Sequence, residues 1–414
     1  MARPQHGQGD ARFVVDEIRF EGNRRTRAEI LLQEVVFRSG DEIERRDIES
    51  ARQAIMDLGL FKSVVAFRHR VRDKNIVTIA VNEKRYWFVL PKLGRSGDGD
   101  ITYGGQIEFD NFTGRNQSLE VVAQRKELQG SDVETEDSFE VEFKYPRMFG
   151  SAYELSIDAG IETAELNEDR FGVRGQYERD LSAVRIAVSR WLAPRGPSRG
   201  WRFGGWARWN DFRHEFISGT PGLFFDATVL TWAGFVEFIA VHDHGFSNSG
   251  REFGSWLEFA DEDFGSDGGF VRPSLRYRHY WRITQRPHTN LNLQLRAALA
   301  TDTIFGDPAY SIGGSSTLRG FRREDIEGDS FILANLEFLT PLYGHYAWRG
   351  AGFVDIGDAY SDFDEFNLSD LKVGAGFGLR WKLRSFVKTD LRLDFAYGFD
   401  GGETKVYAGT KATF

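Results

Sequence analysis

Residues 138–145 read SFEVEFKY, and the apolar side chains of this stretch occupy every second position. Residues 291–299 and 391–397 repeat the alternation, with charged or amide side chains between leucines and aromatic residues. Successive side chains of a strand point to opposite faces, so each of these strands has one apolar and one polar face. The pattern predicts a closed transmembrane β-barrel whose outer face meets lipid and whose lumen is wet.

A soluble β-sandwich is the alternative fold for such strands. Sandwich strands are commonly about 5–6 residues long, and their apolar faces pack against each other. The alternating segments here run for about 10–14 residues and end in Tyr, Trp and Phe, as expected for aromatic girdles at the two membrane interfaces. The sequence therefore favours a mainly β protein with an antiparallel barrel.

Sixteen segments fit the pattern, an even number as in most bacterial single-chain barrels. They are 86–93, 101–112, 115–127, 136–146, 151–163, 178–192, 200–214, 225–242, 251–262, 270–284, 289–302, 328–341, 347–358, 372–383, 386–398 and 403–414. Residues 171–178 form either a further strand or the upper part of a long hairpin, so the expected number is about 16.

The composition excludes several other classes of protein. The 414 residues include 36 Phe, 10 Trp and 45 Gly but no Cys, which excludes disulfides and thiol chemistry. No segment approaches the roughly 18–20 consecutive apolar residues of a spanning helix, since Thr231, Gly234 and Glu237 interrupt the best run. The formal charge of −9 argues against nucleic acid as a partner, because such a partner requires a basic face.

The N-terminal part of the chain has a different pattern. Residues 1–11 are polar, and we expect a disordered lead-in there rather than a signal peptide. Residues 12–84 predict a small β-α-α-β-β domain, and residues 85–414 the barrel. Within the small domain, Thr26 and Glu29 have the spacing of a capping box at the start of the first helix.

The string GGSSTLRGF, at residues 313–321, lies in the longest loop expected between two strands. It resembles the [VIL]-R-G-[FY] loop motif of the BamA and TamA superfamily of outer-membrane assembly and translocation barrels. Residues 335–341 (NLEFLTP) and 352–357 (GFVDIG) are similar to the two strands that follow this loop in the family. Residues 20–23 (FEGN) and 58–61 (LGLF) are similar to the family's POTRA domain. The resemblance covers residues 13–414.

The alternation places two carboxylates inside the expected barrel. Leu336 and Phe338 have the parity of lipid-facing residues, which directs Glu337 into the lumen, and the same argument directs Asp355 inward. Two such acids require a cation, and Arg319 is the candidate because a guanidinium can serve two carboxylates. The alternative is that Arg319 belongs to a flexible surface loop.

The resemblance implies that the loop folds back into the lumen and that its motif residues fix it there. These residues are Leu318, Arg319, Gly320 and Phe321. The glycines at 374, 376 and 378 alternate along a later strand, which suggests close packing against the inserted loop.

A weak lateral seam is expected where the barrel closes. Pro91 in the first strand cannot donate to a ladder, and Gly409 interrupts the last strand. An ordinary bulge is the alternative explanation for Pro91. The terminal Phe414 is similar to the aromatic C-terminus by which assembly machinery recognises outer-membrane proteins.

Motifs of catalysis are missing from the sequence, and we expect no enzyme, no cofactor and no metal site. Neither a nucleophile elbow nor a Walker loop occurs, and no His pair has zincin spacing. The string His242-Asp243-His244 could hold a metal ion, but a solvated loop at the end of a strand explains it better.

Three functions are compatible with these features. The first is an outer-membrane insertase that binds unfolded clients by β-augmentation on its periplasmic domain and inserts them through the seam. The second, within the same family, is a translocator that secretes a partner polypeptide through the lumen. The third is a passive channel or the membrane anchor of a missing enzymatic domain. Expected partners are unfolded outer-membrane or secreted polypeptides and the lipid bilayer, with accessory periplasmic lipoproteins as further candidates.

Overall fold

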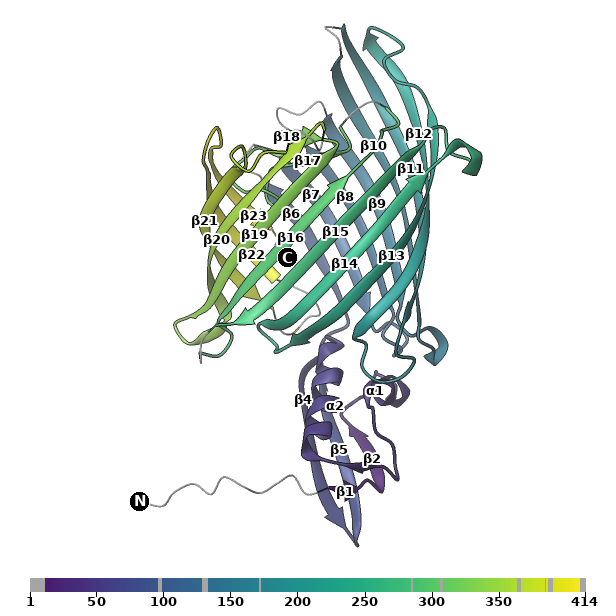
Figure 1. The fold of residues 1–414 in the computed structure, drawn as a ribbon, viewed down its shortest axis with the longest axis vertical. Helices are drawn as coiled ribbons and strands as arrows, with labels where there is room; N and C mark the ends of the chain where they lie inside the picture. Colours follow the sequence, from purple (N-terminus) through teal and green to yellow (C-terminus); the bar gives the residue numbers. More distant parts are fainter. Residues whose placement is uncertain are drawn as a thin grey trace.

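The computed structural model describes residues 12–95, 99–128, 133–170, 173–283, 286–305, 308–362, 366–383, 385 and 390–409. It contains a large barrel and a small domain below one rim of that barrel (Figure 1). The lead-in expected at residues 1–11 lies outside the described residues. Neither helix of the described part is long and apolar enough to cross a membrane.

The small domain has the expected β-α-α-β-β order, with one additional pair of short strands. Its elements are β1 (Phe13–Val14), β2 (Glu17–Glu21), α1 (Ala28–Glu34), β3 (Glu42–Ile43), α2 (Arg45–Asp57), β4 (Phe61–Val71) and β5 (Lys74–Glu83). Strands β2, β5 and β4 form one sheet in that order, in which β2 and β5 are parallel. The buried side chains of α1 and α2 pack against this sheet, with Leu31, Ile55 and Ile79 fully enclosed.

The capping box expected at the first helix is wrong. Helix α1 begins after Arg27, and no side chain caps its N-terminus. The Thr26 hydroxyl instead donates to Glu83 Oε1 at 2.7 Å, because the end of β5 lies next to it. A capping box does occur at α2, where Glu44 and Asp47 exchange hydrogen bonds with each other's backbone.

In the described ranges, sixteen antiparallel strands form the barrel, which confirms the predicted fold class and strand number. They are β6 (Trp87–Arg95), β7 (Ile101–Asp110), β8 (Ser118–Glu127), β9 (Val133–Tyr145), β10 (Tyr153–Arg170), β11 (Val173–Trp191), β12 (Gly200–Gly219), β13 (Ala227–Asp243), β14 (Asn248–Ala260), β15 (Phe270–Arg282), β16 (Asn290–Leu299), β19 (Ser330–Leu342), β20 (His345–Tyr360), β21 (Lys372–Lys382), β22 (Asp390–Gly398) and β23 (Thr404–Gly409). Each strand pairs with the next one in this order.

Side chains alternate across the barrel wall as the sequence pattern predicts. Phe139 and Leu336 are exposed on the outer face, whereas Ser138 and Glu337, their sequence neighbours, are buried on the inner side. The outer face is therefore apolar and the inner face is lined by polar and charged groups.

Three consecutive strands are much longer than a membrane crossing requires. Strands β10, β11 and β12 have 18, 19 and 20 residues, whereas a tilted transmembrane strand needs about 9–11. Figure 1 shows their hairpins rising well beyond the rim opposite the small domain. Residues 173–178 are the upper part of the β10–β11 hairpin, which decides between the two interpretations of that segment.

Candidate functional site

The loop between β16 and β19 returns into the barrel. It contains a short antiparallel pair, β17 (Tyr310–Ile312) and β18 (Ile326–Gly328), and the motif residues lie between these two strands. Leu318 and Phe321 are buried in a cluster with Ile312 and Leu333, the last of which belongs to the barrel wall. Apolar packing thus holds the loop on both sides of Arg319.

Arg319 is fully buried and forms three hydrogen bonds with one carboxylate. Its Nε donates to Asp355 Oδ2 at 2.6 Å and its Nη2 to Asp355 Oδ1 at 2.8 Å. Its backbone N–H also donates to Oδ2, at 3.2 Å. The Phe353 ring lies against the guanidinium, with its centroid 3.4 Å from Cζ. This is the planar, two-pronged geometry in which an arginine and a carboxylate interact most strongly.

The second predicted acid, Glu337, is a more distant neighbour of Arg319. Its Oε1 lies 3.7 Å from Arg319 Nη1, and it hydrogen-bonds to Arg380 instead. Asp394 Oδ2 lies 3.5 Å from the same Nη1, and Asp394 also binds Arg380. Arg392 Nη1 lies 3.9 Å from Asp394 Oδ2. In the described part of the chain, three buried carboxylates and the guanidiniums of Arg319, Arg380 and Arg392 therefore form one ionic network that joins the loop to strands β19 to β22 (the Arg319 network).

Glycines let the loop backbone approach the wall. Gly320 has a φ of +96°, and a Cβ there would overlap the backbone of Gly398. A Cβ at Gly374 would overlap the carbonyl oxygen of Arg319, whereas Gly376 and Gly378 lie against residues of β20 to β22. Of the three alternating glycines, Gly374 is the one that packs on the loop.

Several members of this site were not singled out from the sequence. Asp394, Arg380 and Arg392 belong to the ionic network. The Tyr407 hydroxyl accepts from Gly320 N at 3.1 Å and donates to Phe321 O at 3.2 Å. Asn335 donates from Nδ2 to both Asp355 and the carbonyl of Thr317. Asp394 alternates with Leu393 and Phe395, so its inward direction could have been derived by the parity argument used for Glu337.

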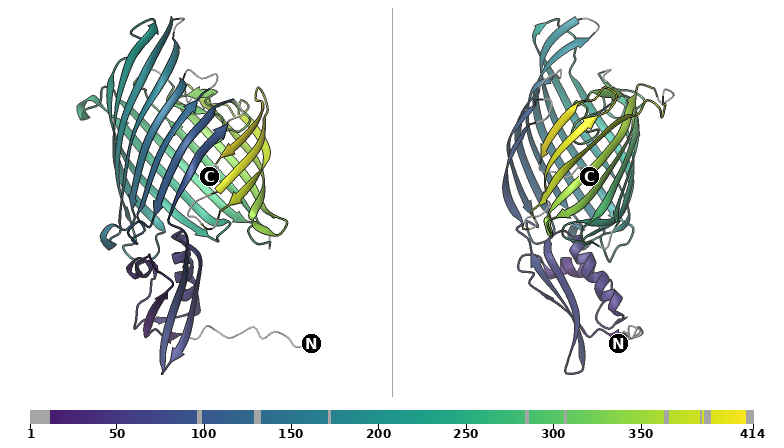
Figure 2. Two further views of the ribbon diagram at one scale, coloured as in Figure 1. Left: turned by 180° about the vertical axis from the view of Figure 1, so that it is seen from behind. Right: turned by 90° about the vertical axis from the view of Figure 1, so that its left-hand side faces the viewer.

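Among the residues that the structure describes, no ladder joins the first and last strands of the barrel. Strands β6 and β23 are the two ends of the sheet order, and Figure 2 shows them side by side. Pro91 lies opposite Gly105 of β7, and Gly409 lies opposite Arg392 of β22. Within the described residues the seam is thus an edge-to-edge approach; Phe414 lies outside them.

The small domain is bound to the turns of the barrel rim by buried polar contacts. Glu34 accepts hydrogen bonds from the backbone N–H and the hydroxyl of Ser198, at 2.7 and 2.6 Å, and lies 3.3 Å from Arg147 Nε. Burial raises the pKa of Glu34, and Arg147 and Ser198 oppose that shift. Nothing in the sequence alone indicated this interface.

A second contact of this interface involves the His242-Asp243-His244 string. His242 Nδ1 lies 2.8 Å from Asp57 Oδ2, and the backbone N–H of Asp243 donates to Asp57 Oδ1 at 2.9 Å. The interpretation of this string as a solvated loop is therefore wrong, because it contacts α2. No cluster of three His, Asp or Glu side chains able to hold a metal occurs among the described residues.

Two family models match separate parts of the chain. Residues 241–410 match the Omp85 superfamily domain, and residues 13–84 match POTRA, described as a surface antigen variable number repeat. The outer membrane protein assembly factor BamA of Neorickettsia risticii (strain Illinois) is 24% identical over 146 residues. That match covers 35% of this chain and 19% of the relative, so the chain aligns with about a fifth of the relative's length.

Three solved structures have a similar fold. BamA from Haemophilus ducreyi, lacking POTRA domains 1–3, aligns with a TM-score of 0.56 and 15% identity, covering 96% of this chain and 84% of that one. CdiB from Acinetobacter baumannii gives a TM-score of 0.66 and 14% identity, covering 95% and 73% of the two chains. CdiB from Escherichia coli gives 0.67 and 17%, covering 95% and 75%. At these identities the likeness concerns the fold alone.

Proposed function

Because the chain belongs to the Omp85 superfamily, with a periplasmic POTRA domain followed by an outer-membrane β-barrel, we propose that it inserts unfolded β-barrel clients into the outer membrane. The observation that carries the proposal is the seam, at which β6 and β23 approach each other without ladder pairing in the described residues. Each backbone group exposed there to hydrocarbon costs several kcal/mol, so a client strand that pairs with it is stabilised.

The POTRA domain supports the first step of this function. Strand β2 is an end strand of the three-stranded sheet, so one of its edges is free of pairing within that sheet. An extended client segment can add to such an edge through main-chain hydrogen bonds, whatever its sequence. The rim contacts of Glu34 and Asp57 then keep the bound segment close to the barrel.

The proposal assigns no enzymatic activity, and accessory periplasmic lipoproteins are candidate partners.

The test uses liposomes that contain the full chain and an added unfolded barrel protein. Because the chain has no Cys, one cysteine introduced in β6 and one in β23 are its only thiols. We expect the reduced protein to accelerate client folding over empty liposomes, and the oxidised protein, with its seam closed by a disulfide, to lose that acceleration. Folding that is equally fast in both states would contradict insertion through the seam.

A second candidate function is translocation of a polypeptide through the lumen. The favouring observation is a polar cavity of about 420 Å³ between the inserted loop and the barrel wall, lined by Thr102, Lys126, Ser316, Arg323 and Tyr407 among others. This function predicts that the oxidised seam leaves export of a partner unchanged. A steady ion current without any effect on a client would instead indicate a passive channel or membrane anchor.

A further inference from the structure

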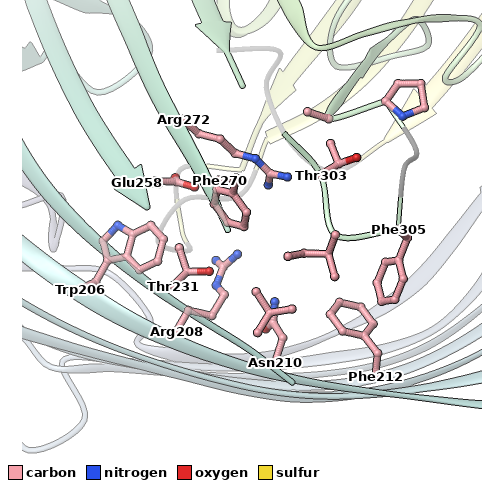
Figure 3. Close-up of a pocket in the computed structure, with 14 residues that line it drawn as sticks. Trp206, Arg208, Asn210, Phe212, Thr231, Glu258, Phe270, Arg272, Thr303 and Phe305 are labelled. Carbon is pink, nitrogen blue, oxygen red and sulfur yellow. The ribbon is translucent and has the colours of Figure 1, made fainter. Parts of the chain in front are cut away.

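A cavity of about 210 Å³ lies in the upper lumen, against the wall formed by β12 to β15. Residues 303–305, 308 and 309 of the loop that follows β16 also line it. Its charged residues are Arg208, Glu258 and Arg272, and Figure 3 shows both guanidiniums directed into the same space. Two arginines and one glutamate give the cavity one net positive charge.

The two guanidiniums have unused hydrogen-bonding capacity. In the part of the chain that the structure describes, neither Arg208 nor Arg272 forms a hydrogen bond or an ion pair. Arg272 Cζ lies 3.9 Å from the centroid of the Phe270 ring, and Arg208 Cζ lies 5.4 Å from that of Trp206. An aromatic ring beside each planar group helps to fix its direction while its N–H donors remain free for a ligand.

Other arginines of the lumen wall differ in this respect. Arg202 is paired with Glu154 and Glu237, at 3.0 and 2.6 Å. Arg278, six residues from Arg272 on the same face of β15, is paired with Glu252 at 2.9 Å. Glu258 lies directly opposite Arg272 in the ladder between β14 and β15, yet no ion pair joins them. Among the described residues, neither guanidinium of the cavity therefore has a carboxylate within ion-pairing distance, in contrast to Arg202 and Arg278.

We infer that this cavity binds a small organic anion, in which one phosphate or carboxylate group is attached to an aromatic or short aliphatic body. Arg208 and Arg272 donate to the anionic oxygens, as guanidiniums do in paired geometry. Trp206, Phe212 and Phe270 supply an apolar wall for the body of the ligand. The volume corresponds to about seven water molecules, which suits a small ligand rather than a polypeptide segment.

The ligand reaches the cavity from the lumen. The ladders extend to Phe212–Ala227 between β12 and β13, to Thr231–Ala260 between β13 and β14, and to Ala260–Phe270 between β14 and β15. A hydrogen-bonded wall therefore separates Arg208, Glu258 and Arg272 from the lipid. A free anion therefore fits the site, whereas a lipid headgroup would have to cross a hydrogen-bonded sheet. The inference does not depend on whether the protein inserts or translocates clients.

Isothermal titration of the full chain in detergent micelles with phenyl phosphate tests the site. We expect Arg208→Gln and Arg272→Gln each to weaken binding about tenfold or more, because each removes a charged donor pair. Glu258→Gln should tighten binding, because it removes the one negative charge of the cavity. Arg278→Gln is the matched control on the same strand, and it should leave the affinity unchanged.

Several results would overturn the inference. One is the absence of phenyl phosphate binding by the parent protein at millimolar concentration. Another is an equal loss of affinity in Arg278→Gln, and a third is weaker binding by Glu258→Gln. If inorganic phosphate bound as tightly as phenyl phosphate, the apolar wall would not contribute to binding, contrary to the inference. An acidic peptide that binds when phenyl phosphate does not would assign the cavity to clients instead.

Discussion

Arg319 connects the inserted loop to three strands of the barrel wall. Its side chain has no exposed surface and lies within 3.7 Å of three carboxylates on three strands. A buried ion pair contributes little when compared with apolar packing, but removal of one partner leaves an uncompensated charge. Loss of one partner should therefore cost more than the whole network contributes to stability.

Replacement of Arg319 tests this role. Arg319→Ala should lower the free energy of unfolding by about 3–5 kcal/mol, because Asp355 then remains charged and buried without its main partner. Arg319→Lys should lower the free energy of unfolding by a smaller amount, since an ammonium keeps the charge but cannot match the two-pronged geometry. Denaturant unfolding, followed by the shift in gel mobility of the folded barrel, measures both.

Arg322 provides the matched control for that measurement. It belongs to the same loop, but its side chain is 61% exposed and pairs with the exposed Glu403. Such surface pairs contribute about 0–1 kcal/mol to stability. The free energy of unfolding of Arg322→Ala should therefore be close to that of the parent protein. Equal stability of Arg319→Ala and Arg322→Ala would show that the network does not hold the loop.

Parity explains how much of this site could be predicted from sequence. Glu337 and Asp355 were placed inside the barrel because their neighbours had to face lipid, and Asp394 follows by the same argument. The distribution of these acids between Arg319 and Arg380 depends on the order of strands around the barrel and on where the loop ends. Neither of these is encoded in the alternation of a single strand.

At the scale of elements, the rim contacts of the POTRA domain connect helices to barrel turns. Glu34 is the last residue of α1, and its partners Arg147 and Ser198 belong to the turns after β9 and β11. Both charged side chains are almost fully buried, at 2% and 5% exposure. A paired charge at such a position fixes the orientation of one domain on the other only while both partners are present.

Glu34→Ala should release this end of the POTRA domain. Arg147 then remains buried without a carboxylate, at a cost of about 3 kcal/mol, the lower end of the range because it keeps carbonyl acceptors. We expect faster hydrogen exchange at the Ser198 amide, which donates to Glu34 in the parent. The control is Glu49 of α2, which is 64% exposed and pairs with Arg52 of the same helix. Glu49→Ala should leave the Ser198 amide protected, and unchanged exchange in both variants would contradict a rigid interface.

Alternation of side chains locates the strands of this barrel but not their ends. The sixteen strands were found because each alternates, but β10 to β12 continue past the segments expected for them. Their outer ends keep the alternation, and Tyr177 packs with Ala164 and Leu166 beyond the membrane-crossing part. The Thr26 cap failed because Glu83 and Asn111, both distant in sequence, hold the Thr26 hydroxyl. It donates to Glu83, and its oxygen accepts from Asn111 instead of from a helix N–H.

For the whole molecule, the inserted loop makes the lumen an obstructed passage. Leu318 and Phe321 fix it by apolar packing in addition to the ionic network. The double variant Leu318→Ala and Phe321→Ala should raise single-channel conductance in planar bilayers several-fold, because a loosened loop leaves the lumen more often.

The control for conductance truncates the same two residue types on the outer face. Leu336 and Phe338 belong to β19 and are exposed toward lipid, so their change to alanine alters apolar area without touching the loop. The currents of this control should equal those of the parent protein. A conductance that rises equally in both double variants would mean that general loss of barrel packing, not loop release, opens the lumen.

The long hairpins of β10 to β12 project from the barrel on the side opposite the POTRA domain. The POTRA domain lies in the periplasm, so these hairpins, on the opposite side of the barrel, rise from the outer leaflet toward the environment. An antibody or a bacteriophage that approaches an intact cell would meet this projection before any other part of the protein. Raising antibodies against it would therefore both reveal the protein on living bacteria and block approach to the barrel mouth from that side.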